Sequence, residues 1–339
     1  MAFFIGVKFM NLQDLPIYQP VEGWVVEYPK FLELTDLCEA NRWLWNESDP
    51  AEDKTDLLTK LSKGELHAIT TILQIFTLFE LNVGDYWVDR IYKRFNRPEI
   101  KALASSINQV EINIHARAYQ RINETLLGSN LESFYIEYKE IEQLKTRIDY
   151  LTKCLKSEND LEAFAAFLFT EGSSLFSMFG TIAHFQAPEY NKNVLKNITG
   201  TITLSAIDED FHAIANALLF NTIIEELGYL PKELENSIYK MAEEILELES
   251  NILDLVFKEG IEKLDKKDML EFIKYRINLC LERINLKPLF ILDNMVVATW
   301  FDLQKGVNTI RLHDFFYSGS GTYSNDVNRG KIRGALETW

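Results

Sequence analysis

The stretch that decides the fold is Ile207-Asp208-Glu209-Asp210-Phe211-His212. It places acidic side chains and a histidine inside a long apolar segment with helical periodicity. Glu80 and Glu171 have similar apolar neighbours in two other such segments. A buried carboxylate is costly unless it is paired or bound to a metal. For any one of these residues a helix cap, a partner arginine or a solvated helix edge is a sufficient explanation. Their repetition along the chain instead indicates a shared site.

Helical periodicity extends outward from this stretch over most of the chain. Apolar residues recur mostly at spacings of three and four, and short breaks with Gly, Pro, Asn or Asp separate the periodic segments. No alternating strand pattern persists over a useful length. The predicted helices cover about 62–94, 99–128, 130–156, 160–186, 200–227, 232–258, 266–285 and 288–304. Long helices joined by short loops predict an all-α fold, an antiparallel bundle whose core sites are built from facing side chains.

The two ends of the chain lack this periodicity. Prolines crowd the beginning of the sequence, which predicts an irregular arm over residues 1–50. The helical domain is expected over 51–304. The sequence from Phe315 onward contains several glycines and serines, and we expect residues 305–339 to form a flexible tail.

The composition limits the possible partners and the compartment. The 339 residues include 51 acidic and 35 basic side chains, which gives a formal charge of −16. This balance argues against nucleic acid or an anionic membrane as a partner, because both require clustered Lys and Arg. No apolar run is long enough to span a membrane, and the first residues are too short a run for a signal peptide. Three widely separated cysteines rule out a disulfide framework and favour the cytoplasm.

The acidic residues and histidines match the ligand set of a dinuclear metal site in a helical bundle. Such a site takes one carboxylate from each of two helices and a Glu-x-x-His pair from each of the other two. Glu209 and His212 form one such pair, and positions i and i+3 share a helix face. Glu80 and Glu171 are the candidate single carboxylates. The series predicts a dinuclear iron or manganese centre with the ligands Glu80, Glu111, His115, Glu171, Glu209 and His212.

The second pair departs from this pattern by one residue, because three residues separate Glu111 from His115. In one interpretation Glu111 is a ligand, and a wide turn or π-bulge absorbs the extra residue, a distortion often found at functional sites. In the other, the helix is regular and Ile112 occupies the ligand position. An apolar side chain facing two cations would leave their charge uncompensated in the core. We therefore favour Glu111.

Tyr119 follows His115 by four residues, so a helix places the two side chains on one face, one turn apart. A core tyrosine satisfied by a hydrogen bond is the simplest interpretation. Beside a dinuclear metal site, however, a phenol becomes a candidate for one-electron oxidation.

Together these motifs resemble the small, radical-generating subunit of class I ribonucleotide reductase over about residues 40–325. The similar motifs are Leu61-Ser62-x-x-Glu65 with Thr77-Leu78-Phe79-Glu80, His115-Ala116-Arg117-Ala118-Tyr119, Glu171-Gly172 and Asp208-Glu209-x-x-His212. The end of the chain, Phe315-Phe316-x-Ser318-Gly319-Ser320-Gly321-x-x-Tyr323, most resembles the class Ib branch. The resemblance implies a ferritin-like helical homodimer with a dinuclear metal site in its core. Such a protein stores a tyrosyl radical and passes it to a cysteine of a separate large subunit, where ribonucleotides are reduced to deoxyribonucleotides.

The resemblance also implies roles for individual residues. Tyr119 would hold the radical, and Asp208 would link the metal site to a tryptophan near the surface. Trp43 matches that tryptophan best, and Trp45 is the competing choice. Tyr323 would be a relay near the subunit boundary, and the last residues would dock on the large subunit. The choice between iron and manganese stays open, as does the need for a flavodoxin-like activase.

Two other classes of protein remain as alternatives. A different ferritin-like carboxylate protein, such as an oxygen-activating oxidase or an iron-storage protein, uses the same ligand series. Storage proteins are usually shorter and need neither the arm tryptophan nor the tail tyrosine. A metal-free helical scaffold would leave the buried acidic residues unexplained.

Overall fold

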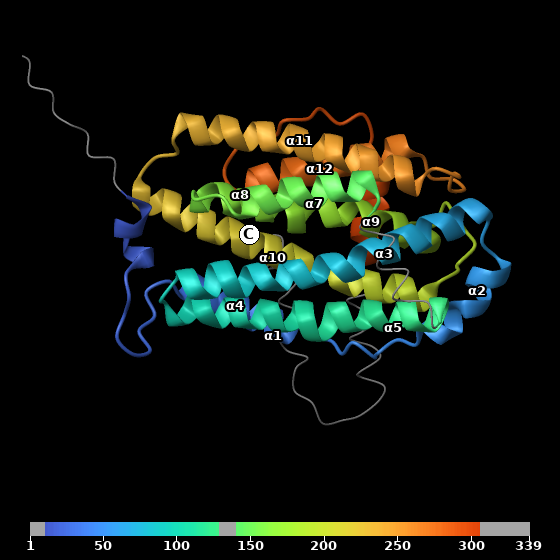
Figure 1. Ribbon diagram of the computed structural model, residues 1–339, viewed down its shortest axis with the longest axis horizontal. Coiled ribbons are helices and arrows are strands. Elements are labelled where there is room, and N and C mark those ends of the chain that lie inside the picture. The colour runs from blue at the N-terminus through green and yellow to red at the C-terminus, as the bar shows by residue number, and fades with distance from the viewer. Residues whose placement is uncertain (1–10, 129–139, 306–339) are drawn as a thin grey trace, which may run out of the picture.

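The computed structural model describes residues 11–128 and 140–305, except the side chains of residues 77–82 and 127. The long helices run side by side along the longest axis of the molecule, with α11 along one edge of the bundle and α4 and α5 along the other (Figure 1). The described residues contain no β-strand. The predicted all-α bundle is therefore confirmed.

Within the described residues, the bundle consists of α-helices of very different length, three π-helical turns and four short 3₁₀ turns. The α-helices are α1 (Pro29–Ala40), α2 (Lys54–Thr59), α3 (Lys63–Tyr86), α4 (Pro98–Val110), α5 (Ala116–Leu127), α7 (Glu142–Leu155), α8 (Asp160–Phe169), α9 (Leu175–Ala183), α10 (Lys196–Leu227), α11 (Lys232–Val256) and α12 (Lys266–Arg283). A further helical segment covers 296–305. The π turns are η4 (Trp87–Tyr92), η5 (Glu111–His115) and η6 (Thr170–Ser174), and the 3₁₀ turns are η1 (Leu12–Asp14), η2 (Pro16–Tyr18), η3 (Pro50–Asp53) and η7 (His184–Gln186).

Local sequence signals set several helix boundaries. Ser62 and Glu65 form a capping box at the start of α3, in which each side chain accepts a hydrogen bond from the other residue's backbone N–H. Pro98 is the first residue of α4, where its missing N–H is not needed. Gly128 ends α5 with a φ of 70°, which favours glycine. These boundaries agree with the predicted ones.

The helix that carries Glu111 contains the predicted π turn. η5 covers Glu111–His115 between α4 and α5. Glu111 is fully buried, whereas Ile112 is half-buried and packs closely on Gly84 of α3. A Cβ atom added at Gly84 would lie 2.7 Å from Ile112 Cδ1. The register with Glu111 in the core is confirmed, and the regular helix is the wrong alternative.

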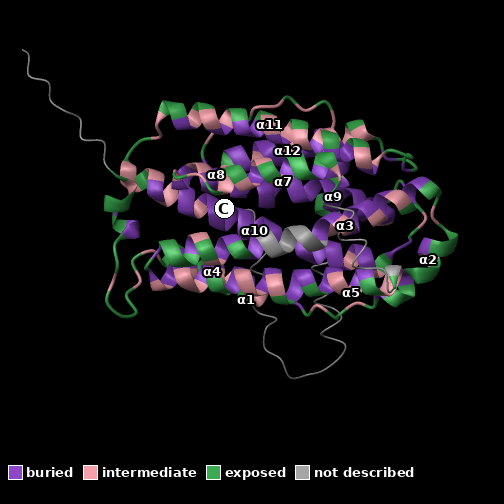
Figure 2. Cartoon of the chain, in the orientation of Figure 1, coloured by how far each residue is buried: buried purple, intermediate pink, exposed green. Residues whose placement is uncertain are grey.

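The innermost layer consists of α8, η6, α9 and the middle of α10. Nearly all side chains of these elements are buried, while the outer helices alternate buried and exposed residues (Figure 2). α10 packs on α8, α9 and η6. Polar side chains in this layer must find their partners within the protein. That requirement singles out Glu171, Asp208, Glu209, Asp210 and His212.

A regular helix lies within the segment that we expected to be an irregular arm. α1 starts at Pro29, and its residues Phe31, Leu34 and Cys38 are buried where the helix packs on α4 and α10. Tertiary packing on one helix face stabilises α1 although prolines surround it. The division into an arm at 1–50, a domain at 51–304 and a tail at 305–339 remains a prediction.

The last predicted helix is shorter than expected, because 288–295 are not helical. Asn278 of α12 explains this: its Oδ1 accepts hydrogen bonds from the backbone N–H groups of Leu289 and Phe290 at 2.9 and 3.0 Å. The side chain thus satisfies two backbone N–H groups of this non-helical segment. The predicted helix at 130–156 is described only from Glu142, since 129–139 lie outside the described residues. No helix in the described part is both long and apolar enough to cross a membrane.

Candidate metal centre

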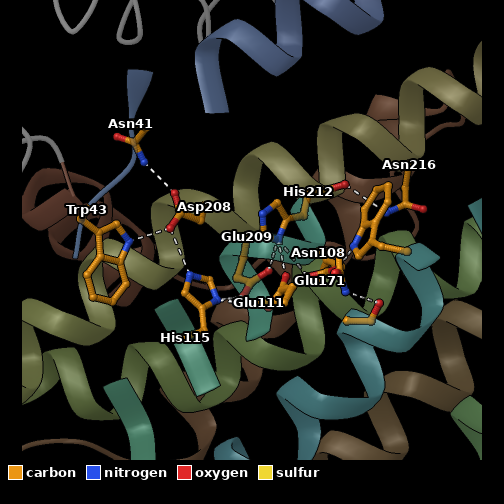
Figure 3. A network of polar contacts seen from close by, with 12 residues as sticks. Asn41, Trp43, Asn108, Glu111, His115, Glu171, Asp208, Glu209, His212 and Asn216 are labelled. Carbon is orange, nitrogen blue, oxygen red and sulfur yellow. Dashed lines mark hydrogen bonds and ion pairs between the residues drawn. The ribbon is translucent and has the colours of Figure 1, made fainter. Parts of the chain in front are cut away.

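Four buried side chains converge in the middle of the bundle (Figure 3). Glu111 lies in η5, Glu171 lies in η6, and Glu209 and His212 lie on α10. One potential ligand atom from each residue lies within 4.8 Å of all the others. Three carboxylates and one imidazole at this spacing form a donor set for a metal ion.

The Glu-x-x-His pair of α10 points at the other carboxylates. His212 Nδ1 lies 2.6 Å from Glu111 Oε1, 2.8 Å from Glu209 Oε2 and 3.7 Å from Glu171 Oε2. The spacing of three residues directs Glu209 and His212 to the same side of the helix. The structure therefore brings this predicted pair together with both π-turn carboxylates.

His115 joins the cluster through its Nδ1 atom. This atom lies 3.2 Å from Glu111 Oε2 and 3.2 Å from Glu209 Oε1. On the other side of the ring, Nε2 lies 3.0 Å from Asp208 Oδ2. Because an ionised carboxylate only accepts hydrogen bonds, Asp208 favours the tautomer with its proton on Nε2. The lone pair of Nδ1 then faces the carboxylates, as a metal ligand requires.

The pKa values of two carboxylates in the cluster are shifted in opposite directions. Burial raises the pKa of Glu171 well above its usual range, and the nearby Glu209 carboxylate raises it further. Burial alone would also raise the pKa of Glu111, but the interactions with the neighbouring His212 and His115 lower it overall. A bound cation would favour the charged form of each of these carboxylates.

Buried oxygen atoms of the cluster also lack hydrogen bonds. Among the described residues, no donor forms a hydrogen bond of acceptable geometry with Glu171 Oε2 or Glu209 Oε1. Buried polar atoms in folded proteins are normally satisfied. Carboxylates and imidazoles are ligands that iron and manganese accept. The residues present therefore fit a metal centre of the predicted kind.

A chain of hydrogen bonds leads from the cluster to the segment that follows α1 (Figure 3). Trp43 Nε1 donates to Asp208 Oδ2 at 2.7 Å, and the same oxygen contacts His115 Nε2. Asn41 Nδ2 donates to Asp208 Oδ1 at 2.7 Å. Trp43 is buried, and its ring stacks on the His115 ring with centroids 5.8 Å apart. Of the two candidate tryptophans, Trp43 is the one connected to the cluster.

Trp45 has a different environment. Its ring faces the guanidinium group of Arg117, whose Cζ lies 4.3 Å from the ring centroid. The guanidinium of Arg121 lies 6.0 Å from the same centroid. These cation–π contacts belong to a half-exposed side chain at the margin of the bundle.

Tyr119 is fully buried in α5, one turn beyond His115. The centroids of the two rings are 6.3 Å apart, and Tyr119 stacks on Phe76 of α3 at 5.0 Å. The predicted proximity of the phenol to the cluster is confirmed. Burial of this kind limits solvent access and so the side reactions of a reactive group.

The sequence reasoning missed Trp87 and Asn41. Trp87 lies in η4, is fully buried, and its Nε1 donates to Glu171 Oε1 at 3.3 Å. The only available signal was general, since a buried indole usually finds a hydrogen-bond acceptor. Asn41 lies at the end of α1, which we had expected to be irregular.

Two predicted site residues lie outside the described part of the structure. Glu80 belongs to α3, but its side chain is not described. Tyr323 follows residue 305, where the description ends. The roles assigned to both residues therefore stay predictions.

Comparison with known proteins agrees with this geometry. The model of the family described as ribonucleotide reductase, small chain, matches residues 23–294. The chain belongs to the ribonucleotide reductase small-chain family. One relative, the probable ribonucleoside-diphosphate reductase small subunit 376L of Invertebrate iridescent virus 6, is 26% identical over 89% of this chain and 93% of its own length. The ribonucleoside-diphosphate reductase subunit beta of Chlamydia pneumoniae is 26% identical over 84% of this chain and 86% of its own.

Solved structures of small-chain proteins share the fold. The ribonucleotide reductase R2 subunit from Clostridium botulinum superposes with a TM-score of 0.75 at 21% identity, over 84% of this chain and 91% of that one. The dimanganese(II)-NrdF of Streptococcus sanguinis gives a TM-score of 0.73 at 20% identity, over 84% of this chain and 100% of that one. The described helices thus follow the small-chain architecture.

Proposed function

We propose that this chain is the radical-generating small subunit of a class Ib ribonucleoside-diphosphate reductase. It would generate and store a tyrosyl radical at Tyr119 and supply it to a separate large subunit that reduces ribonucleotides. The family membership supports the reaction. The buried cluster beside Tyr119 supports the radical chemistry.

The observation that carries the proposal is the hydrogen-bonded chain from Trp43 through Asp208 to His115. An iron-storage protein or a simple oxidase needs a metal site but no hydrogen-bonded path that leads from the site towards the surface. This chain of contacts connects the candidate metal centre to the arm, away from the buried Tyr119. It therefore favours long-range radical transfer over the two alternative functions.

The candidate ligands would hold a dinuclear iron or manganese centre. They are Glu111, His115, Glu171, Glu209 and His212, with Glu80 as the sixth. Such a centre, together with oxygen or a reduced oxygen species, supplies the oxidising power that removes one electron from the phenol of Tyr119.

The protein groups around the site would control protons and access. Asp208 accepts a hydrogen bond from Trp43 with 2.7 Å between Nε1 and Oδ2, so the carboxylate can take the indole proton when Trp43 is oxidised. The proton returns to Trp43 when the electron comes back from the large subunit. Asn41 holds the second oxygen of Asp208 and fixes its orientation. Trp87 holds Glu171 in the same way.

The partners follow from the same proposal. A homodimer of this chain would dock on the large subunit through residues 305–339, with Tyr323 as the relay at the boundary. A flavodoxin-like activase would be required if the working metal is manganese. All three cysteines, Cys38, Cys154 and Cys280, are free, which suits the reducing cytoplasm where we place the protein.

The decisive experiment is reconstitution of the full-length metal-free protein with iron and oxygen, and separately with manganese with and without an activase. Metal counts, an electron paramagnetic resonance spectrum and ribonucleotide reduction with a matching large subunit are then measured. Two metals per chain, a tyrosyl signal and activity are expected with at least one metal. Metal binding with neither a radical nor activity under every condition would instead favour the oxidase or storage alternative.

A further inference from the structure

Asp210 lies between the candidate ligands Glu209 and His212 on α10, but its partners lie outside the metal cluster. Its Oδ1 contacts Arg276 Nη2 at 2.5 Å and Arg283 Nη2 at 3.1 Å. Its Oδ2 contacts Lys305 Nζ at 2.5 Å. We call Asp210, Arg276, Arg283 and Lys305 the Asp210 cluster. It places three positive charges around one buried carboxylate, directly behind the ligand-bearing turn of α10.

Arg276 connects this cluster to the second ligand-bearing segment. Its Nε donates to the backbone oxygen of Gly172 at 2.8 Å, and Gly172 follows Glu171 in η6. The guanidinium is fully buried, and its Cζ lies 3.4 Å from the centroid of the Phe176 ring. One side chain of α12 therefore contacts residues adjacent to both Glu171 and Glu209. A shift of the Arg276 side chain would therefore affect the residues next to both Glu171 and Glu209.

Lys305 connects the cluster to the end of the chain. It is the last described residue of the helical segment 296–305, and residues 306–339 follow it. Its ammonium group also lies 3.4 Å from Asp302 Oδ1 and 5.5 Å from the centroid of the Phe301 ring. The side chain of Lys305 keeps 15% of its surface exposed, so it reaches solvent without crossing the core.

The surplus of positive charge makes Lys305 the replaceable member of the cluster. When Lys305 leaves, Asp210 keeps both arginines, so no buried carboxylate is left unpaired. Loss of Arg276 would instead also break the contact with Gly172. Opening of the Lys305–Asp210 pair would therefore leave Asp210 paired, and the pair lies at the end of the helical segment 296–305.

We propose that the Lys305–Asp210 ion pair couples the helical segment 296–305 to the metal centre, so that opening of the pair strengthens metal binding and metal loading loosens the segment. The inference rests on the proposed function, because it requires a metal at the Glu/His cluster. An ammonium group behind α10 opposes binding of cations to the nearby carboxylates. Since coupling between two sites is reciprocal, a metal-loaded centre must weaken the Lys305–Asp210 ion pair by the same factor.

The first test measures Mn²⁺ binding to the full-length metal-free protein. The readout is the decrease in the paramagnetic resonance signal of free Mn²⁺. Lys305→Met removes the charge at similar length and should bind Mn²⁺ at least about fivefold more tightly, the lower limit of typical coupling between sites. Lys305→Arg should bind like the unmodified protein. Lys274→Met is the control, because Lys274 lies on the same helix as Arg276 but pairs with Glu271 outside the cluster.

The second test measures the reciprocal effect by hydrogen exchange of peptides covering 296–305. Mn²⁺ should accelerate exchange in the unmodified protein, and this dependence on Mn²⁺ should vanish in Lys305→Met. Equal or weaker Mn²⁺ binding by Lys305→Met, with the other variants binding normally, would overturn the coupling and leave the proposed function intact. If no variant binds Mn²⁺ or Fe²⁺, the coupling and the metal centre of the proposed function both fail.

Discussion

Trp43 donates a hydrogen bond of 2.7 Å from its indole nitrogen to Asp208, 165 residues further along the chain. The packing of α1 against α10 brings the two residues together, since nothing in the local sequence links them. Under the proposed function, the contact would give the indole proton an acceptor when the ring loses an electron.

Replacement of Trp43 by Phe should therefore stop radical transfer, because Phe has neither the N–H group nor an accessible oxidation. Ribonucleotide reduction with a matching large subunit should fall by about 100-fold or more, a loss typical when a positioned group is removed. Trp45→Phe is the matched control and should keep most of the activity. Equal losses in the two variants would show that the hydrogen bond to Asp208 does not define the route.

Tyr119→Phe should abolish the stored radical. The ring would still stack on Phe76, and metal binding should persist because the phenol is not expected to be a required ligand. Metal counts should match those of the unmodified protein, while the tyrosyl resonance signal and the activity disappear. A radical signal of unchanged shape and intensity would remove Tyr119 from the mechanism.

Glu111→Ala should sharply reduce metal occupancy, because it deletes a fully buried carboxylate that faces both His115 and His212. Ile112→Ala, one residue away, should leave occupancy unchanged. Since Ile112 is only half-buried, that variant should lose less than about 2 kcal/mol in free energy of unfolding, the lower limit for buried large-to-small changes. Metal analysis and thermal unfolding separate the two effects. Two metals per chain in Glu111→Ala would make this carboxylate dispensable.

Truncation after Phe316 should leave the fold, the metal and the radical intact but abolish association with the large subunit. The aromatic residue at the C-terminus, Trp339, is a suitable anchor for a groove on a partner. A synthetic peptide of residues 320–339 should compete with the full-length chain in a binding assay. Normal binding by the truncated protein would show that the tail is only a linker.

The capping box of α3 predicts a pH dependence of stability. Burial would raise the pKa of Glu65, but hydrogen bonds from the Ser62 backbone and the Tyr190 hydroxyl lower it overall. A carboxylate whose pKa is lower in the folded state stabilises the protein above its unfolded pKa of about 4.3, and this stabilisation is lost as the pH falls through the folded value. The difference in unfolding free energy between the unmodified protein and Glu65→Gln should be about 1.5–3 kcal/mol at pH 6 and shrink below pH 4. A difference that does not change with pH would contradict an ionised Glu65.

The sequence was sufficient for the features that depend on local pattern. Helical periodicity predicted most of the helices, and a single extra residue between Glu111 and His115 predicted the π turn that the structure contains. The spacing of Glu209 and His212 predicted that both would face one side of α10. Each of these features follows from residues close together in the chain.

Contacts between distant segments could not be predicted in this way. The hydrogen bond of Trp87 to Glu171 and the pairing of Asp210 with Lys305 depend on how the helices pack. The helix α1 was missed because the prolines around it outweighed its short apolar face. In all three cases tertiary packing decides, and the sequence alone does not show which helices become neighbours.

The π turn at Glu111–His115 also lets Tyr119 keep its position despite one extra residue in the chain. One residue more than a regular helix would need lies between the two ligands, so deletion of Asn113, which is exposed, would restore the regular spacing. The π turn absorbs this extra residue, so the residues after it would stay on the same face of the helix once it is deleted. Tyr119 would then keep its place against Phe76, although the chain would be one residue shorter. Alignments of this helix should accordingly allow a one-residue gap within 112–114, because a gapless alignment would match Tyr119 with a residue on the wrong face.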